Sequence, residues 1–292
     1  MTSRLKTRRS RLYALTAAVV LLAVAAMPVS AITHGQKDGD GHPYVGLVVA
    51  IDEDGFALWQ CTGTLISDSL FLTAGHCTEP PAAHIEIWFS AGPVPLDPEF
   101  GAALEAAFPD DVSCSSDPVS FDGYPCGGDV GGTPYGHPQY DPSAFFLFDL
   151  GMVVLDDPMP MAQYGALPEL DQLDALEPRR ATTFTSVGYG RQRSFPDAAS
   201  WKVEAVRERY VAKPHLLQIN TGFTGDFSLM LSNDANTGGT CFGDSGGPNF
   251  LGNTNVIAGV TSFALNFPCG GAGGVYRIDR ADDLEFINSF LE

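Results

Sequence analysis

The stretch Gly243-Asp244-Ser245-Gly246-Gly247-Pro248 decides how this chain is interpreted, because it places one serine in a short run of glycines. A nucleophilic serine needs an exposed hydroxyl on a tight turn, with backbone N–H groups that converge where an oxyanion forms. Glycines on both sides of Ser245 let the backbone take that path and leave room for a substrate. A glycine-rich turn between two strands is the alternative, so the motif needs support from elsewhere in the chain.

The histidine motif Thr73-Ala74-Gly75-His76-Cys77 lies directly after a short apolar run at residues 70–72. We expect that run to be a strand, and a base at its end, beside a cysteine that forms a disulfide, is held in one orientation. Histidine is the usual general base near neutral pH. A lone histidine beside a cysteine is more often structural or a metal ligand, but the serine motif favours a catalytic role.

A single acidic residue, Asp149, lies near the start of the otherwise apolar stretch at residues 148–155. A buried carboxylate is costly unless it is hydrogen-bonded and paired. Asp149 therefore needs a partner, and the N–H group of a histidine ring is a suitable one.

The composition limits the classes of function. The 292 residues include 35 acidic and 16 basic ones, which gives a net charge of −19 at pH 7. Nucleic-acid-binding surfaces are basic, so the charge argues against that class of partner. The acidity suits solubility, and steering of cationic substrates is the alternative interpretation.

Short apolar runs between clusters of Gly, Pro, Asp and Asn predict a mostly β structure of the barrel or sandwich type. Strands are expected at residues 45–51, 62–66, 85–89, 181–187 and 256–262. A helical pattern is clear only at residues 279–291, where Leu284, Ile287 and Leu291 share one face. Asp279 is a suitable N-cap for this helix.

Residues 92–140 differ from the rest, since they are rich in Pro, Gly and Asp and contain Cys114 and Cys126. We interpret them as a long surface insertion. Its acidic residues could bind calcium, but they show no EF-hand pattern, so a solvated loop is favoured. The histidines other than His76 show no metal-ligand spacing, and we predict no metal and no cofactor.

Residues 1–31 have the order of a secretory signal peptide: five basic residues, an apolar run at residues 12–26, and the small-residue site Val29-Ser30-Ala31. The apolar run is shorter than the about 20 residues of a membrane span, so an N-terminal anchor is the weaker alternative. Removing the segment would bring the net charge from −19 to about −24. Six cysteines in an exported chain predict three disulfides, and spacing alone leaves about 15 connectivities open.

The three motifs, in the order histidine, aspartate, serine, resemble those of the chymotrypsin family of serine peptidases, over most of residues 32–292. Further stretches add to the resemblance: Ile32-Thr33-His34-Gly35, His137-Pro138-Gln139-Tyr140, Gly188-Tyr189-Gly190, Thr261-Ser262-Phe263 and Gly274-Val275-Tyr276. It implies an all-β fold of two packed antiparallel six-stranded β-barrels and a C-terminal helix. The barrels would cover residues 32–170, which include the insertion, and residues 171–278, and the helix residues 279–292. Two disulfides common in animal members are missing, which indicates a bacterial-type member.

The resemblance also implies the role of each residue. Ser245 attacks the scissile carbonyl, His76 transfers the proton, and Asp149 orients the imidazole. The N–H groups of Gly243 and Ser245 form the oxyanion hole. The expected function is that of a secreted, monomeric endopeptidase that cleaves proteins or peptides through an acyl-enzyme.

The resemblance places five residues around the primary substrate pocket: Gly239, Thr240, Ser262, Ala264 and Gly274. Trypsin-like members carry an aspartate where Gly239 stands. A pocket without that charge cannot stabilise a buried Arg or Lys, so we expect apolar P1 residues. Gly274 is expected to leave depth for Leu, Met, Phe or Tyr, and Ala264 to reduce the width.

The cysteines are ordered by the same resemblance. It pairs Cys61 with Cys77, beside the histidine, and Cys241 with Cys269, beside the pocket. Cys114 and Cys126 are then left to pair with each other.

Activation in this family uses a new N-terminal ammonium, here that of Ile32, which pairs with the carboxylate beside the nucleophile, here Asp244. The predicted signal-peptide site ends directly before Ile32. We therefore expect signal peptidase itself to create the activating terminus. Cleavage after Ala25, followed by removal of a short propeptide, is the alternative.

Two other functions compete with peptidase activity. A catalytically silent relative could serve as a binding module, although such relatives usually lose a triad residue. An esterase could use the same triad, but the sequence around Ser245 differs from the Gly-x-Ser-x-Gly elbow of α/β-hydrolases.

Overall fold

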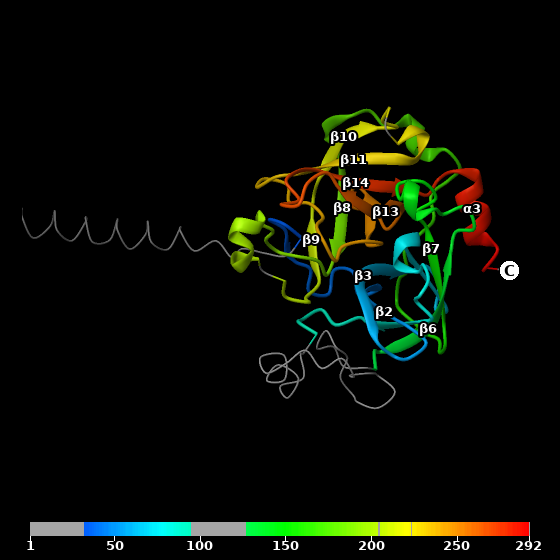
Figure 1. Ribbon diagram of the computed structural model, residues 1–292. Coiled ribbons are helices and arrows are strands. Elements are labelled where there is room, and N and C mark those ends of the chain that lie inside the picture. Colours follow the sequence, from blue (N-terminus) through cyan, green and yellow to red (C-terminus); the bar gives the residue numbers. More distant parts are fainter. Residues whose placement is uncertain (1–31, 95–126, 204, 223, 292) are drawn as a thin grey trace, which may run out of the picture.

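The computed structural model describes residues 32–94, 127–203, 205–222 and 224–291 (Figure 1). The predicted signal peptide, Cys114, Cys126 and most of the predicted insertion lie outside the described residues. Within the described ranges, no helix combines the length and the apolar composition that a membrane span needs.

The first barrel closes in the antiparallel order β2-β3-β4-β7-β6-β5. Its strands are β2 (Val45–Ile51), β3 (Ala57–Leu65), β4 (Leu70–Thr73), β5 (His84–Trp88), β6 (Val130–Gly136) and β7 (Gly151–Leu155). Every residue of β2 is buried, because this strand has covered faces on both sides. Val48 and Ala50 belong to the main core, while Leu47 and Val49 pack in a second cluster with Tyr189.

The second barrel closes in the order β8-β10-β11-β14-β13-β12, with β12 pairing back to β8. Its strands are β8 (Arg179–Gly188), β10 (His215–Ile219), β11 (Ser228–Asn233), β12 (Pro248–Leu251), β13 (Ile257–Ala264) and β14 (Gly271–Arg277). Strand β9 (Tyr210–Ala212) also pairs with β8, and β1 (Gln36–Lys37) pairs with β9. The N-terminal segment therefore joins the second barrel, although the sequence assigned it to the first. The predicted fold of two six-stranded barrels is confirmed (Figure 1).

Short helices connect the strands. The 3-10 helices are η1 (Gly75–Cys77), η2 (Pro142–Ala144), η3 (Gln172–Ala175), η4 (Asp197–Lys202) and η5 (Gly225–Phe227). Helix η1 directly follows β4 and carries His76, so the strand end fixes the position of that residue.

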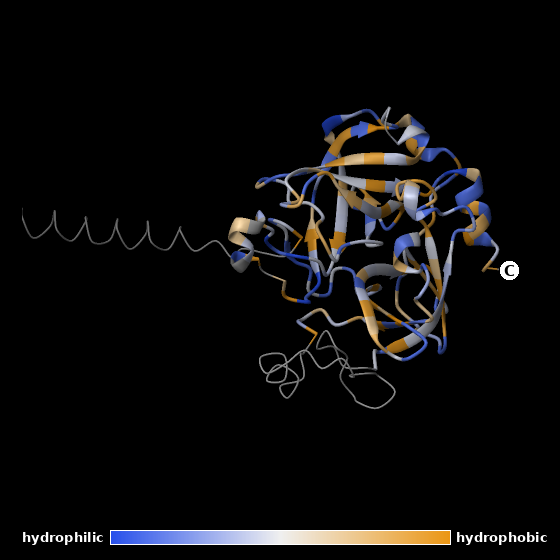
Figure 2. Cartoon of the chain, in the orientation of Figure 1, coloured by the Kyte–Doolittle hydropathy of each residue, from blue (hydrophilic) through white to orange (hydrophobic). Residues whose placement is uncertain are grey.

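The C-terminal helix is α3 (Ala281–Asn288), and Figure 2 shows hydrophobic and hydrophilic residues along it. The predicted N-cap was wrong, since Arg280 occupies that position. Asp279 instead accepts hydrogen bonds from the buried Arg277 guanidinium, Nε at 2.7 Å and Nη2 at 2.8 Å, because a buried cation needs a carboxylate partner. Ile287 enters the core as predicted, but Leu291 remains 48% exposed.

The predicted insertion, residues 92–140, extended too far at its C-terminal end. Strand β6 pairs with β5 and β7, so residues 130–136 belong to the first barrel. Their Gly and Pro content suggested a loop, but close packing explains two of the glycines. A Cβ on Gly131 would lie 2.6 Å from His84, and one on Gly132 would lie 2.6 Å from Val153.

Candidate active site

His76 and Asp149 meet where η1 approaches the start of β7. The Asp149 carboxylate is fully buried, and its Oδ1 accepts a hydrogen bond of 2.9 Å from the His76 backbone N–H. The ring Nδ1 of His76 lies 3.0 Å from each carboxylate oxygen. An Nδ1–H facing the carboxylate leaves Nε2 of the neutral ring without a proton, as a general base requires.

Ser262 supplies a further hydrogen bond to this carboxylate. Its hydroxyl donates to Asp149 Oδ2 at 2.6 Å from β13, across the boundary between the barrels. The sequence placed Ser262 in the pocket wall, but did not identify this contact. Three donors on one buried carboxylate offset much of the cost of removing its charge from water.

The residue before Asp149 has a strained backbone. Phe148 has a φ of 52°, in the left-handed region that bulky residues rarely adopt. Its ring stacks on the buried His137 ring with centroids 5.0 Å apart, and it also contacts Phe227 at 5.4 Å. This aromatic packing holds a backbone conformation that brings the next side chain to His76.

The pKa of His76 lies above its ordinary value of 6.5. Burial by itself lowers the pKa, because it disfavours the imidazolium. The charge of Asp149, its hydrogen bond to the ring and the charge of Glu79 act in the opposite direction and outweigh burial.

The turn that carries Ser245 requires its glycines. Gly243 and Gly246 have φ values of 94° and 76°. A Cβ on Gly246 would lie 2.0 Å from Thr73 Oγ1, and one on Gly243 would lie 2.9 Å from the backbone of Gly190. No other residue type fits either position without displacing the backbone.

Two backbone donors in this turn are available for a ligand. Thr62 binds the two carbonyl groups, since its hydroxyl donates to Gly243 O at 2.8 Å and its N–H to Ser245 O at 2.7 Å. Among the described residues, neither the Gly243 N–H nor the Ser245 N–H has a hydrogen-bond partner. Unpaired N–H groups beside a partly exposed serine fit the predicted oxyanion hole.

Asp244, next to the serine, is fully buried. Its Oδ1 accepts from the Gly190 N–H at 2.7 Å, and its Oδ2 from the Cys241 N–H at 2.8 Å. Burial raises the pKa of Asp244 to about 7, because these two hydrogen bonds only partly compensate for desolvation. Within the described part of the chain, no cationic side chain pairs with it.

Ile32, the predicted partner of Asp244, is also fully buried and packs against Tyr210 and Ala212. The following residue, Thr33, forms an antiparallel bridge with Gly239, whose N–H donates to Thr33 O at 3.0 Å. The segment that begins at Ile32 therefore packs against the second barrel. Its bridge partner, Gly239, shortly precedes the serine turn in the sequence.

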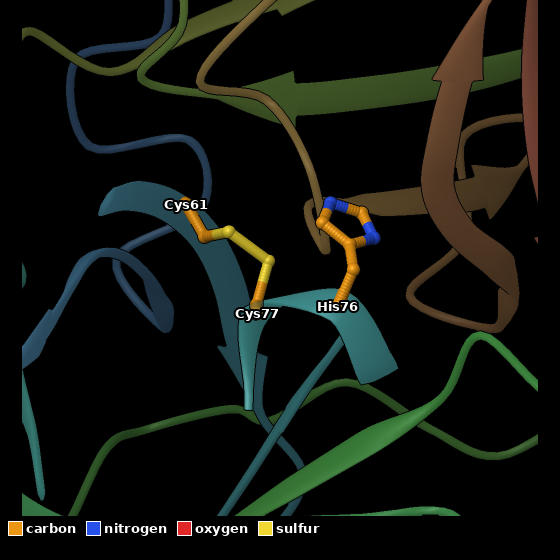
Figure 3. A group of neighbouring side chains, drawn as sticks. All are labelled: Cys61, His76 and Cys77. Carbon is orange, nitrogen blue, oxygen red and sulfur yellow. A yellow bond between two sulfur atoms is a disulfide. The ribbon is translucent and has the colours of Figure 1, made fainter. Parts of the chain in front are cut away.

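Two of the three predicted disulfides lie within the described residues, and both are formed, Cys61–Cys77 and Cys241–Cys269. The third, Cys114–Cys126, lies outside them. Figure 3 shows the Cys61–Cys77 bridge beside the His76 ring. These three side chains are close enough to resemble a metal site, but the sulfurs of a disulfide are not the thiolates that a metal binds.

A pocket of about 340 Å³ opens beside His76 and Ser245, and we call it the primary pocket. Its lining consists of His76, Phe145, Thr240, Cys241, Phe242, Ser245, Thr261, Ser262, Phe263 and Ala264. The predicted pocket residues Thr240, Ser262 and Ala264 are among them. The sequence did not identify Phe145 and Phe242.

Gly239 and Gly274 do not line this pocket, contrary to the prediction. A Cβ on Gly239 would lie 2.4 Å from the Asn233 side chain, so this position faces β11. A Cβ on Gly274 would lie 2.3 Å from the Phe263 ring. Gly274 therefore makes room for Phe263, its partner on the neighbouring strand, rather than for a substrate.

Comparisons with known proteins identify the family of the chain. The family model described as Trypsin matches residues 120–281, a range that includes Asp149 and Ser245. No curated protein sequence matched the chain.

Solved structures share the fold. HL collagenase aligns with a TM-score of 0.59 and 19% sequence identity, over 89% of this chain and 99% of its own. Human heparin binding protein aligns with a TM-score of 0.56 and 17% identity, over 89% of this chain and 96% of its own. At these identities the likeness shows the fold alone. The family model covers more than half of the sequence, and the chain therefore belongs to the trypsin family.

Proposed function

We propose that this chain is a secreted serine endopeptidase, with Ser245 as nucleophile, His76 as general base and Asp149 as the residue that orients the base. The observation that carries the proposal is the buried Asp149 carboxylate, which lies 3.0 Å from Nδ1 of His76. His76 and Ser245 line the same pocket. Secretion and a bacterial type are supported by residues 1–31 and by the cysteine content.

The reaction would proceed in two halves. Ser245 Oγ attacks the scissile carbonyl carbon while Nε2 of His76 takes the hydroxyl proton, and the oxyanion accepts from the Gly243 and Ser245 N–H groups. The C–N bond then breaks as His76 returns the proton to the leaving amine. Water, activated by the same histidine, hydrolyses the acyl-enzyme and restores Ser245.

Two alternatives have less support. A silent binding relative has no need of two unpaired N–H donors beside a serine, and the sequence around Ser245 differs from the Gly-x-Ser-x-Gly elbow of α/β-hydrolases. The heparin named for one structural relative is a polyanion, which a chain of net charge −19 would repel.

We expect the mature protein to cleave after apolar residues in a peptide library. Three phenylalanines and Ala264 give the primary pocket apolar surface, and none of its described lining residues is acidic. An Arg or Lys at P1 would be buried without a partner, so its kcat/KM should be lower by roughly 100-fold. The Ser245→Ala variant serves as the blank, and a clear preference for Arg or Lys would overturn this specificity.

The pH dependence should report the pKa of His76. The base acts only when neutral, so kcat/KM should rise with pH through a midpoint above 6.5, since the pKa of His76 is raised. Glu79→Gln should lower that midpoint, because the negative charge of Glu79 is one of its causes. Glu177→Gln, at an exposed carboxylate, is the matched control and should leave it unchanged. A midpoint below 6.5 in the parent would contradict the His76 assignment.

A further inference from the structure

A second pocket of about 240 Å³ lies beside Gly243. Gln60, Gly190, Arg191, Arg207, Phe242 and Gly243 contribute to its lining. Phe242, which is 41% exposed, lines both pockets and so stands between them.

The position of this second pocket assigns it to the leaving fragment. A scissile carbonyl that binds the Gly243 N–H has its acyl side in the primary pocket, against β13. The residues after the scissile bond must then pass the opposite flank of Gly243, where Gln60 of β3 lies. This assignment rests on the proposed peptidase function.

The charge of the second pocket is unusual for this chain. Only 16 of the 292 residues are basic, and five of those precede residue 32, yet two arginines line this one pocket. None of the described residues that line it is acidic. Glu208, which follows Arg207 in the sequence, forms an ion pair with Lys37 at 2.7 Å. The buried Asp244 carboxylate accepts a hydrogen bond from the Gly190 N–H.

Arg191 is preorganised for an anionic ligand. Its backbone N–H donates to Phe242 O at 2.9 Å, and its guanidinium lies 5.1 Å from the Phe242 ring centroid and 5.7 Å from that of Phe267. Stacking on aromatic rings fixes the guanidinium plane while its N–H edge can still bind a carboxylate.

We propose that the second pocket binds a carboxylate of the leaving fragment, so that the enzyme prefers substrates with an acidic group within the first residues after the scissile bond. The carboxylate could be an Asp or Glu side chain or the C-terminal carboxylate of a short fragment. Arg191 determines this specificity by a charge-assisted contact that an amide cannot replace, and Arg207 adds positive charge to the lining of the pocket.

The test uses quenched fluorescent peptides on the mature protein. They share one apolar P1 residue and an amidated C-terminus, and they carry Glu or Gln at P1′, P2′ or P3′. A second pair ends two residues after the scissile bond as a free acid or an amide, which separates the two sources of carboxylate. In at least one pair, the acid should be cleaved with a kcat/KM roughly tenfold above the amide, less so at high salt.

The variants locate the effect. Arg191→Gln with Arg207→Gln should bring the acid-to-amide ratio close to one, because only the acidic peptides lose a charge-assisted contact. Arg180→Gln, at an exposed arginine outside the pocket, should keep the parent ratio. The Arg191→Lys and Arg207→Lys variants keep the charge and should retain part of the preference, which separates charge from loss of folding.

Failure of this inference differs from failure of the proposed function. If every peptide is cleaved and the parent shows no acid preference at any position, the inference is wrong. A preference that persists in the folded double Gln variant also overturns it. If no peptide is cleaved at all, the proposed function fails first.

Discussion

The Ser245→Ala variant is expected to lose peptidase activity by roughly 10⁴- to 10⁶-fold in kcat while keeping its fold. The substitution removes the attacking oxygen and leaves the His76–Asp149 pair untouched. Ser245 makes no side-chain hydrogen bond among the described residues, so little stability should be lost. His76→Ala should have an effect of similar size, since the hydroxyl then lacks its base.

Activity is measured with an apolar P1 peptide, and stability by thermal unfolding. Ser289→Ala is a matched control at the exposed C-cap of α3, where the hydroxyl donates to Phe286 O. It should keep full activity. Hydrolysis by purified Ser245→Ala protein at the parent rate would show that another residue is the nucleophile.

Addition of one residue before Ile32 of the mature chain is expected to reduce activity by about 100-fold or more. Ile32 is fully buried, and Asp244 has only backbone N–H partners among the described residues. A free Ile32 ammonium would supply the missing cation and hold the serine turn. Extension replaces that ammonium with a neutral amide, and loss of a buried ion pair costs about 3 kcal/mol or more.

The pH dependence of stability gives an independent readout of the same pair. With Ile32 blocked, the pKa of Asp244 is about 7, against 3.8 for an ordinary carboxyl. The folded state then holds a proton that the unfolded state releases, so the free energy of unfolding falls as pH rises from about 4 to about 7. The protein that begins at Ile32 should lack this loss, because its ammonium favours the ionised carboxylate.

N-terminal sequencing of the secreted, active enzyme completes this test. A start at Ile32, in a host without other extracellular proteases, supports direct activation by signal peptidase. Full activity in a protein that starts at Ala26 or Met27 would refute both the activation mechanism and the Ile32–Asp244 pair.

Local sequence patterns predicted much of the fold, and they also indicated which residues form the candidate site. Strand β2 covers the predicted residues 45–51, because seven consecutive apolar or small residues can fill a strand buried on both faces. The tight turn at Ser245 was predictable from its glycines alone, because a positive φ is a local property of the residue that adopts it.

Contacts across strands could not be predicted in this way. The Phe263 ring covers Gly274 because β13 and β14 pair these two residues. The sequence of either strand alone does not determine that register. Ser262 reaches Asp149 across 113 positions of sequence. The Gly and Pro residues of β6 are typical of a loop in the sequence. They form a strand because β5 and β7 pair with them on both sides.

Covalent labelling of the mature protein with a fluorophosphonate, mapped by tandem mass spectrometry, identifies the nucleophile. Such a reagent reacts only with a serine that a base has activated and whose oxyanion hole is formed. We expect a single adduct, on Ser245, which His76→Ala abolishes. An adduct on another residue, or no adduct in folded protein that begins at Ile32, would contradict this assignment.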